Sequence, residues 1–182
     1  LKRNGVRVII PHEQVCCGSP LIRTGQLEYL PTLQQRIIVC FTSRNIDTVM
    51  TMCAGCGSTL KNDYRTPFAV KDVNEILTEI GIEEPARLPL TVTYHDPCHL
   101  LRGQGIRDQP RALIRRVADL KEMAVMKCCG AGGGTRSGVP EVSKALGLKR
   151  DEEIIKTGAD VVISSCPFCE THMGISCQTP VK

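Results

Sequence analysis

Short runs of apolar, β-branched residues alternate along the chain with longer segments in which apolar positions recur at helical spacing. The short runs predict strands at residues 6–10, 47–52, 90–94, 121–126 and 160–164. The longer segments predict helices at residues 30–45, from about 57, and at 70–80, 110–117 and 140–157. Alternating strands and helices predict an α/β fold with mainly parallel sheets, whose functional groups gather at the carboxyl ends of the strands.

A proline-containing segment at residues 83–89 separates two such series and is typical of a linker. We place the boundary near residue 86, with one half-domain at residues 1–86 and the other at residues 87–182. The second half opens on a strand, a turn and Cys98 at the start of the next helix, whereas the first half lacks this unit. We therefore expect the first half-domain to be N-terminally truncated, with its equivalent of Cys98 upstream of this chain.

The composition describes a globular chain of 182 residues, of which 42 % are hydrophobic. No apolar run is long enough to span a membrane, and no apolar signal region follows the basic residues at the start. The net charge of +4 is modest and only 3 % of residues are aromatic, so the basic stripe or stacking surface of a nucleic-acid-binding protein is missing. We expect neither nucleic-acid binding nor direct insertion into a membrane.

The cysteines change this picture because the chain repeats one cysteine pattern. In each half a Cys-Cys-Gly triplet is followed by a Cys-x-x-Cys pair, with 35 residues between Cys17 and Cys53 and 36 between Cys129 and Cys166. A recurring separation of thiols indicates a duplicated ligand frame, and so two related metal or iron–sulfur sites. The duplication also predicts that the two half-domains are related by a pseudo-twofold axis.

The second frame offers five thiols from three strand ends, namely Cys98, Cys128, Cys129, Cys166 and Cys169. A structural zinc ion takes four ligands, and adjacent side chains reach one ion with difficulty. Several irons can use adjacent thiolates on different metal atoms, so this frame favours an iron–sulfur cluster over zinc. The following glycine run lets the backbone approach a cluster, and we expect Gly130 and Gly132 to offer N–H donors to its sulfurs.

The first frame offers four thiols, and its loop carries Pro20 where the second has glycines. The four thiols are Cys16, Cys17, Cys53 and Cys56. Because Pro20 donates no N–H, the donors of the second frame cannot all be present here. Four thiolates suit zinc, and they suit a second cluster if an upstream segment carries a fifth thiol, so both cofactors stay open for the first frame.

Vicinal cysteines in an α/β pattern indicate metal ligands of a reducing compartment rather than disulfides. We therefore expect a cytoplasmic protein, either free or peripheral on a membrane complex. Cys56, Cys98 and Cys169 each precede a predicted helix, whose positive end favours an ionised thiolate. Cys40 lies in an apolar helical stretch and is expected in the core, and Cys177 is expected to have no ligand role.

Together these motifs resemble the cysteine-rich CCG domains of heterodisulfide reductase catalytic subunits and of thiol:fumarate reductase. The domain also occurs in iron–sulfur subunits of glycolate and lactate oxidation systems. The resemblance covers residues 15–172 and rests on Cys16-Cys17-Gly18, Asp96-Pro97-Cys98-His99, Cys128-Cys129-Gly130-Ala131-Gly132-Gly133-Gly134 and Ser165-Cys166-Pro167-Phe168-Cys169. It implies a noncubane 4Fe-4S cluster at each complete frame: one at the second frame, and either a second cluster or zinc at the first.

The resemblance further implies an oxidoreductase module that reduces a disulfide held between two clusters, or oxidises two thiols, with one electron from each cluster. No ferredoxin-type cysteine run is present, so the electrons must come from a ferredoxin-type or flavin subunit or from an upstream domain. An electron-transfer role in a glycolate or lactate oxidase complex is one alternative. A zinc-stabilised interaction domain is the other.

Three polar side chains are candidates for handling an anionic thiol or disulfide substrate. His99 follows a cysteine ligand and could pass a proton to a departing thiol, or it could cap its helix. Arg23 and Arg136 occupy matching places after the two Cys-Cys-Gly triplets. Each could face a cluster or the substrate, or could bond loop carbonyls instead.

Overall fold

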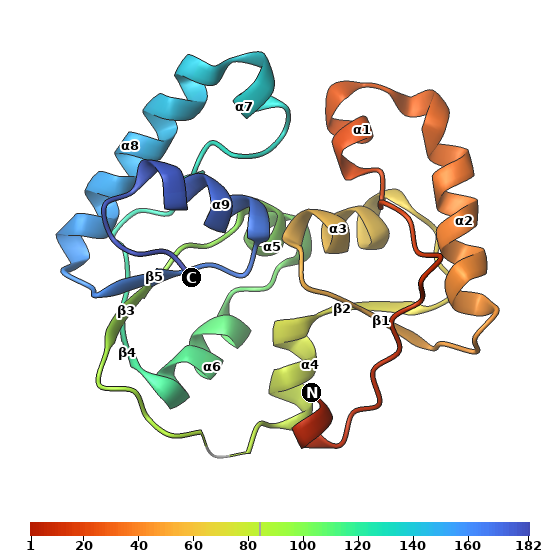
Figure 1. Cartoon of the computed structure of the whole chain (residues 1–182), viewed down its shortest axis with the longest axis horizontal. Coiled ribbons are helices and arrows are strands. Elements are labelled where there is room, and N and C mark those ends of the chain that lie inside the picture. The colour runs from red at the N-terminus through yellow and green to blue at the C-terminus, as the bar shows by residue number, and fades with distance from the viewer. Residues whose placement is uncertain (84) are drawn as a thin grey trace.

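Each half of the chain has its own small parallel sheet flanked by helices (Figure 1). The computed structural model describes residues 1–83 and 85–182. Of the linker predicted at residues 83–89, residue 84 lies outside the described residues. The mixed α/β architecture with parallel strand pairs confirms the predicted fold class.

The elements of the first half are η1 (Lys2–Asn4), α1 (Ser19–Thr24), η2 (Leu27–Tyr29), α2 (Leu30–Thr42), β1 (Thr48–Thr51), α3 (Ala54–Ser58), the π-helical turn η3 (Thr59–Asp63), β2 (Ala69–Asp72) and α4 (Val73–Ile80). Those of the second half are β3 (Thr91–Tyr94), α5 (Cys98–Gln104), α6 (Asp108–Val117), β4 (Asp119–Lys121), α7 (Thr135–Gly138), α8 (Pro140–Thr157), β5 (Val161–Ile163) and α9 (Pro167–Ser176). The helices predicted at residues 110–117 and 140–157 are thereby confirmed as α6 and α8.

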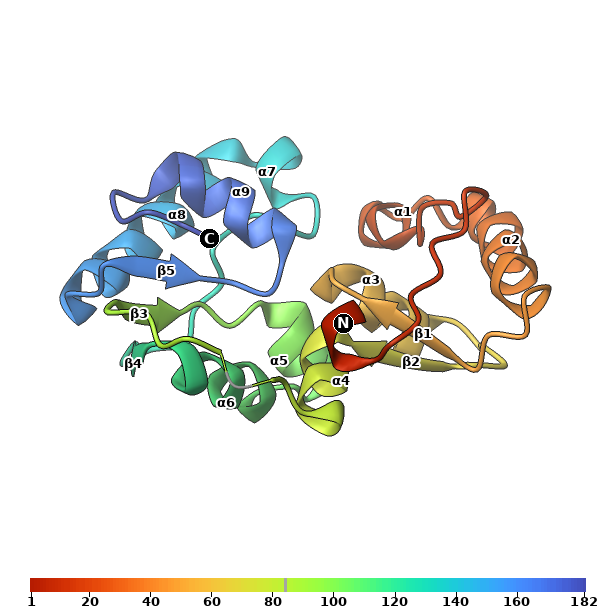
Figure 2. The same cartoon turned by 60° about the horizontal axis from the view of Figure 1, so that its bottom comes forward.

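The sheet topology brings the cysteine-bearing ends of the strands together. In the first sheet β1 pairs with β2, and in the second β3 lies between β4 and β5. Cys53 follows β1, Cys98 follows β3 and Cys166 follows β5. Because parallel strands end at the same edge, these cysteines are delivered to the carboxyl edges of their sheets. Figure 2 shows α8 and α9 on one face of the second sheet and α6 on the other.

The two halves repeat one succession of elements after each Cys-Cys-Gly triplet. A short helix, a long helix, a strand, a cysteine and a further helix appear as α1, α2, β1, Cys53 and α3, and again as α7, α8, β5, Cys166 and α9. Figure 1 shows the two series facing each other about an approximate twofold, with α3 and α9 near the centre. This arrangement confirms the predicted duplication.

The halves are joined through α3 and α5. Ala54 of α3 has no exposed surface and belongs to the same core cluster as Leu100 and Ile106 of the second half. The Gln104 side chain donates to the Ala54 carbonyl at 3.0 Å, and Asn62 donates to the Gly103 carbonyl at 2.6 Å. The junction therefore combines apolar burial with satisfied backbone carbonyls. Among the described residues, no helix combines the length and apolar character that crossing a bilayer requires.

Two strand predictions are wrong, and one predicted helix begins later than expected. Residues 6–10 form no strand. The extended segment predicted at 121–126 is also not a strand beyond its first residue, because β4 ends at Lys121. β-branched composition alone does not make a strand, because a strand needs a neighbouring strand for its backbone hydrogen bonds. β4 has such a neighbour in β3, whereas residues 6–10 lie in no sheet of the described chain. The helix predicted at 70–80 begins only at Val73, since β2 precedes it and Asp72 caps it through a capping box with Glu75.

Candidate functional site

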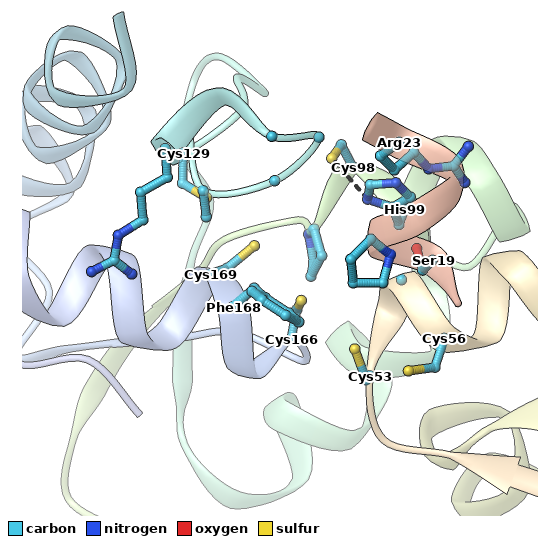
Figure 3. A pocket seen from close by; sticks show the side chains of 18 of the residues that line it. Ser19, Arg23, Cys53, Cys56, Cys98, His99, Cys129, Cys166, Phe168 and Cys169 are labelled. Carbon is cyan, nitrogen blue, oxygen red and sulfur yellow. Dashed lines mark hydrogen bonds between the residues drawn. The ribbon is translucent and has the colours of Figure 1, made fainter. Parts of the chain in front are cut away.

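Both cysteine frames open onto one cavity of about 570 Å³ at the junction of the halves (Figure 3). Nine cysteines line it: Cys16, Cys17, Cys53, Cys56, Cys98, Cys128, Cys129, Cys166 and Cys169. Cys40 is instead buried in α2, and Cys177 packs against the second-half core. The structure therefore gathers the eight thiols of the repeated pattern together with Cys98, and it leaves out the two cysteines for which no ligand role was expected.

The Cys-x-x-Cys pairs lie at the beginnings of helices. Cys53 and Cys166 are the N-terminal caps of α3 and α9, both in extended conformation. Cys56 and Cys169 were expected before a helix but lie in the first turn of those helices, whereas Cys98 is the first residue of α5. Each helix begins directly after the first cysteine of its pair. Residues three apart share one helix face, so both thiols of a pair point into the cavity.

The thiols of the first frame are in mutual contact and reach the second frame. Cys17 and Cys56 hydrogen-bond through their Sγ atoms at 3.2 Å, which lowers the pKa of Cys17 to about 7 and raises that of Cys56. The thiols of Cys166 and Cys56 lower the pKa of Cys53 to about 2. Figure 3 shows Cys53 and Cys166 on facing sides of the junction. The two frames are thus adjacent at these residues.

In the second frame the adjacent thiols meet different neighbours. Hydrogen bonding by Cys129 and then Cys98 lowers the pKa of Cys128 to about 2. The pKa of Cys129 is raised to about 11, chiefly by Cys128, while its other thiol neighbour is Cys169. Hydrogen bonds to Cys129 and Cys166 raise the pKa of Cys169. Besides contacting each other, these two thiols reach two further cysteines, Cys98 and Cys169, and a thiol group of this size suits a core with several metal atoms better than one tetrahedral ion.

A buried ion pair fixes the turn that presents Cys98. Arg111 of α6 donates two hydrogen bonds to the Asp96 carboxylate, at 2.8 and 2.7 Å, and the two side chains are only 8 % and 6 % exposed. The guanidinium carbon also lies 5.3 Å from the centroid of the Tyr94 ring. Because Asp96 and Pro97 directly precede Cys98, this clamp sets where the thiol enters the cavity.

We expect Arg111→Leu to lower the free energy of unfolding by about 3–5 kcal/mol, because Asp96 would keep a buried carboxylate without its partner. Arg115 provides the control: it lies on the same helix, is 58 % exposed and pairs with Glu122. Arg115→Leu should cost less than about 1 kcal/mol. Urea denaturation of the two variants measures the difference, and equal losses would contradict the clamp.

The glycine loop combines a tight contact with open space. Gly130 has a φ of 91°, and a Cβ there would lie 2.7 Å from the carbonyl oxygen of Ser143, so this position requires glycine. A Cβ at Gly132 would meet only His99, at 3.8 Å, and its backbone is not left-handed. In the first frame the matching residues are not a loop: Ser19 and Pro20 begin α1, where the missing proline N–H is of no consequence.

The three polar candidates all line the cavity. His99 is half-buried, its Nδ1 lies 3.5 Å from the Sγ of Cys98, and burial followed by the charge of Arg23 lowers its pKa. Arg23 pairs with the Asp63 carboxylate at 3.4 Å rather than with a loop carbonyl, and Arg136 is exposed on α7. Arg23 and Arg136 therefore put positive charge on the cavity wall from opposite halves.

Three residues near the thiols were missed by sequence reasoning. Phe168 lines the cavity with 58 % of its surface exposed, and its place between the paired cysteines could have indicated this. Arg111 carried no sequence signal for its pairing with Asp96. His95 carried no sequence signal for a place at the site, yet a ring nitrogen and the sulfurs of Cys129 and Cys169 all lie within 4.8 Å of one another.

Comparison with known proteins agrees with this geometry. A family model described as a cysteine-rich domain, CCG, matches residues 1–61 and 92–174. The chain belongs to the CCG cysteine-rich domain family. The two matched segments contain both Cys-Cys-Gly triplets, both Cys-x-x-Cys pairs and Cys98, so the family match covers all nine cysteines of the cavity.

Three curated relatives show what the chain is similar to. An uncharacterized iron–sulfur protein of Methanococcus maripaludis is 50 % identical over 177 residues, covering 95 % of this chain and 36 % of the relative. A fumarate reductase (CoM/CoB) subunit of Methanothermobacter marburgensis is 44 % identical, with the same coverage. A dihydromethanophenazine:CoB–CoM heterodisulfide reductase subunit of Methanosarcina barkeri is 31 % identical, covering 95 % of this chain and 47 % of the relative. The chain thus spans between a third and a half of the length of these relatives.

Proposed function

We propose that this CCG chain is the disulfide-reducing iron–sulfur module of a larger oxidoreductase, able also to run the reverse oxidation of two thiols. The observation that carries the proposal is the convergence of both cysteine frames on one cavity of about 570 Å³. The relatives named as heterodisulfide reductase and fumarate reductase (CoM/CoB) subunits support this choice, as do those named as iron–sulfur proteins.

The residues of the second frame fit a noncubane 4Fe-4S cluster. Five soft thiols surround one side of the cavity, each thiol of the vicinal pair also contacts a further cysteine, and the glycine run leaves room beside them. We assign Cys98, Cys128, Cys129, Cys166 and Cys169 to this cluster. Cys16, Cys17, Cys53 and Cys56 are assigned to a second cluster at the first frame, where zinc is the alternative.

Bound clusters supply electrons singly, and a disulfide needs two electrons and two protons to become two thiols. The chain's own residues provide the remaining parts of that reaction. Arg23 and Arg136 attract and orient an anionic substrate from the two sides of the cavity. His99, beside Cys98, takes up a proton from solvent and passes it to a departing thiolate, and its lowered pKa makes the transient imidazolium a ready donor. Phe168 contributes an apolar wall.

The proposed electron source is a ferredoxin-type or flavin partner subunit, or another domain of the same protein. The chain contains no ferredoxin-type cysteine run, so it must be loaded with electrons from outside the described fold. Free thiols in this number fit a reducing compartment, and we propose a cytoplasmic location for the module.

Disulfide-dependent turnover tests the proposal. The intact, anaerobically purified protein is mixed with reduced viologen and CoB–CoM heterodisulfide, the compound named for its relatives, and viologen oxidation and free thiol are measured. We expect two thiols for each disulfide and no oxidation without it. A protein that passes electrons to a quinone-type acceptor but never to the disulfide would instead be the electron-transfer subunit of a hydroxy-acid oxidising complex.

A further inference from the structure

The buried imidazole of His95 stands outside the proposed ligand set. Its backbone is fixed at the end of β3, where the His95 N–H donates to the Ile163 carbonyl at 2.9 Å. The side chain is 1 % exposed, and neither ring nitrogen has a hydrogen-bond partner among the described residues. Buried polar groups without a partner are rare because each costs about 1–3 kcal/mol, so this imidazole calls for a partner that the protein alone does not supply.

The imidazole faces the second frame. One of its ring nitrogens and the sulfurs of Cys129 and Cys169 lie within 4.8 Å of one another. His95 does not line the cavity, so it approaches these sulfurs from the protein side rather than from the substrate side. Those two sulfurs are also the proposed ligand atoms. A filled second frame would therefore place electron-rich sulfur beside an imidazole that lacks a partner.

The ring can serve as a donor whatever its protonation state. A neutral imidazole has one N–H and an imidazolium has two, so His95 always has at least one N–H for sulfur. The five thiols already supply the metal ligands, which leaves hydrogen bonding as the role open to the imidazole.

We propose that His95 donates its ring N–H to a sulfur of the second frame and thereby raises the reduction potential of the cluster held there. The inference rests on the proposed function, since it needs a cluster at that frame. An N–H donor stabilises the reduced cluster more than the oxidised one because reduction adds negative charge to its sulfurs. His95 thus acts on the reduction potential of the cluster through the ligand sulfurs, from the side that faces the protein core.

The effect should be confined to the second cluster. Among the described residues, His99 is the only histidine that lines the cavity, and the first-frame contacts given for Cys17, Cys53 and Cys56 include no imidazole. Removing His95 should therefore shift one midpoint potential and leave the other in place.

The test compares His95→Leu, which removes the donor, with His95→Gln, which keeps an N–H, in the intact holoprotein. His172→Leu is the matched control, because His172 is also buried and its Nε2 also has no partner among the described residues. Iron and acid-labile sulfide are measured first, followed by EPR-monitored redox titration. We expect the iron content of His95→Leu to equal that of the parent. The one-electron redox equilibrium of the second cluster should shift roughly three- to tenfold toward its oxidised form, so its midpoint potential falls by ~30–60 mV. His95→Gln should recover part of the shift.

Each outcome separates the inference from the proposed function. A parent protein without iron and sulfide refutes both. A parent with its cluster, combined with a His95→Leu potential no different from that of His172→Leu, refutes the role of His95 alone. Loss of iron from folded His95→Leu would make His95 a metal ligand and overturn the donor assignment. If His95→Leu does not fold, His95→Met, which also lacks a donor, takes its place in the comparison.

Discussion

Replacing Cys128 or Cys166 by serine should remove the second cluster and with it disulfide reduction. Cys128 meets Cys98 and Cys129, and Cys166 joins Cys169 to Cys53 of the first frame, so each change removes a central thiol of the group. We expect the iron content of anaerobically purified protein to fall by about four atoms per chain. The EPR signal of the oxidised, thiol-treated protein should disappear as well.

Cys177→Ser is the matched control for these variants. Cys177 is partly buried and adjoins Ser176, but it does not line the cavity. Its replacement should leave iron content, EPR signal and turnover at the values of the parent. Full iron content in both Cys128→Ser and Cys166→Ser would show that the ligand assignment is wrong.

Gly132→Val should lower the rate of disulfide reduction at least about tenfold while leaving the iron content near that of the parent. The new side chain would extend into the cavity, where a Cβ meets only the Cε1 of His99. No thiol is removed and the backbone is not strained, so the expected loss is one of substrate access, worth at least ~1.4 kcal/mol.

Gly174→Val controls for the added bulk. A Cβ at Gly174 in α9 meets nothing within 4 Å, and the residue does not line the cavity. It should reduce disulfide at nearly the parent rate in the same viologen assay. If Gly132→Val also turns over at the parent rate, the glycine loop is only a structural turn and the substrate approaches from the first frame.

The grouping of cysteines could be predicted because ligand spacing and strand ends are both visible in the sequence. A cysteine placed directly after a β-branched run must emerge at the carboxyl edge of a parallel sheet, as Cys53 and Cys166 do. That the two frames would share one cavity was not predictable in the same way. It depends on how α3 packs against α5 around Ala54, a contact between residues with no recognisable pattern.

The features that the sequence did not predict have one physical cause. Local propensity carries no information about which residues far apart in the sequence pack or bond together. Residues 6–10 have strand composition but lie in no sheet of the described chain. The burial of His95 could not be predicted, because the sequence around a single histidine beside a strand is the same whether the side chain is exposed or only 1 % exposed. Arg111 likewise gains its role only when α6 brings it against Asp96. Burial and pairing of this kind are properties of the fold.

Metal and sulfide analysis of the anaerobically purified protein, with an EPR spectrum of the same sample, tests the iron–sulfur assignment most directly. If the five thiols of the second frame hold a cluster, the protein contains at least about four iron atoms and about four acid-labile sulfides per chain, twice that if the first frame also holds one. Zinc at the first frame would appear as one additional ion. Stoichiometric zinc without iron or acid-labile sulfide would contradict the assignment and indicate a zinc-stabilised interaction domain.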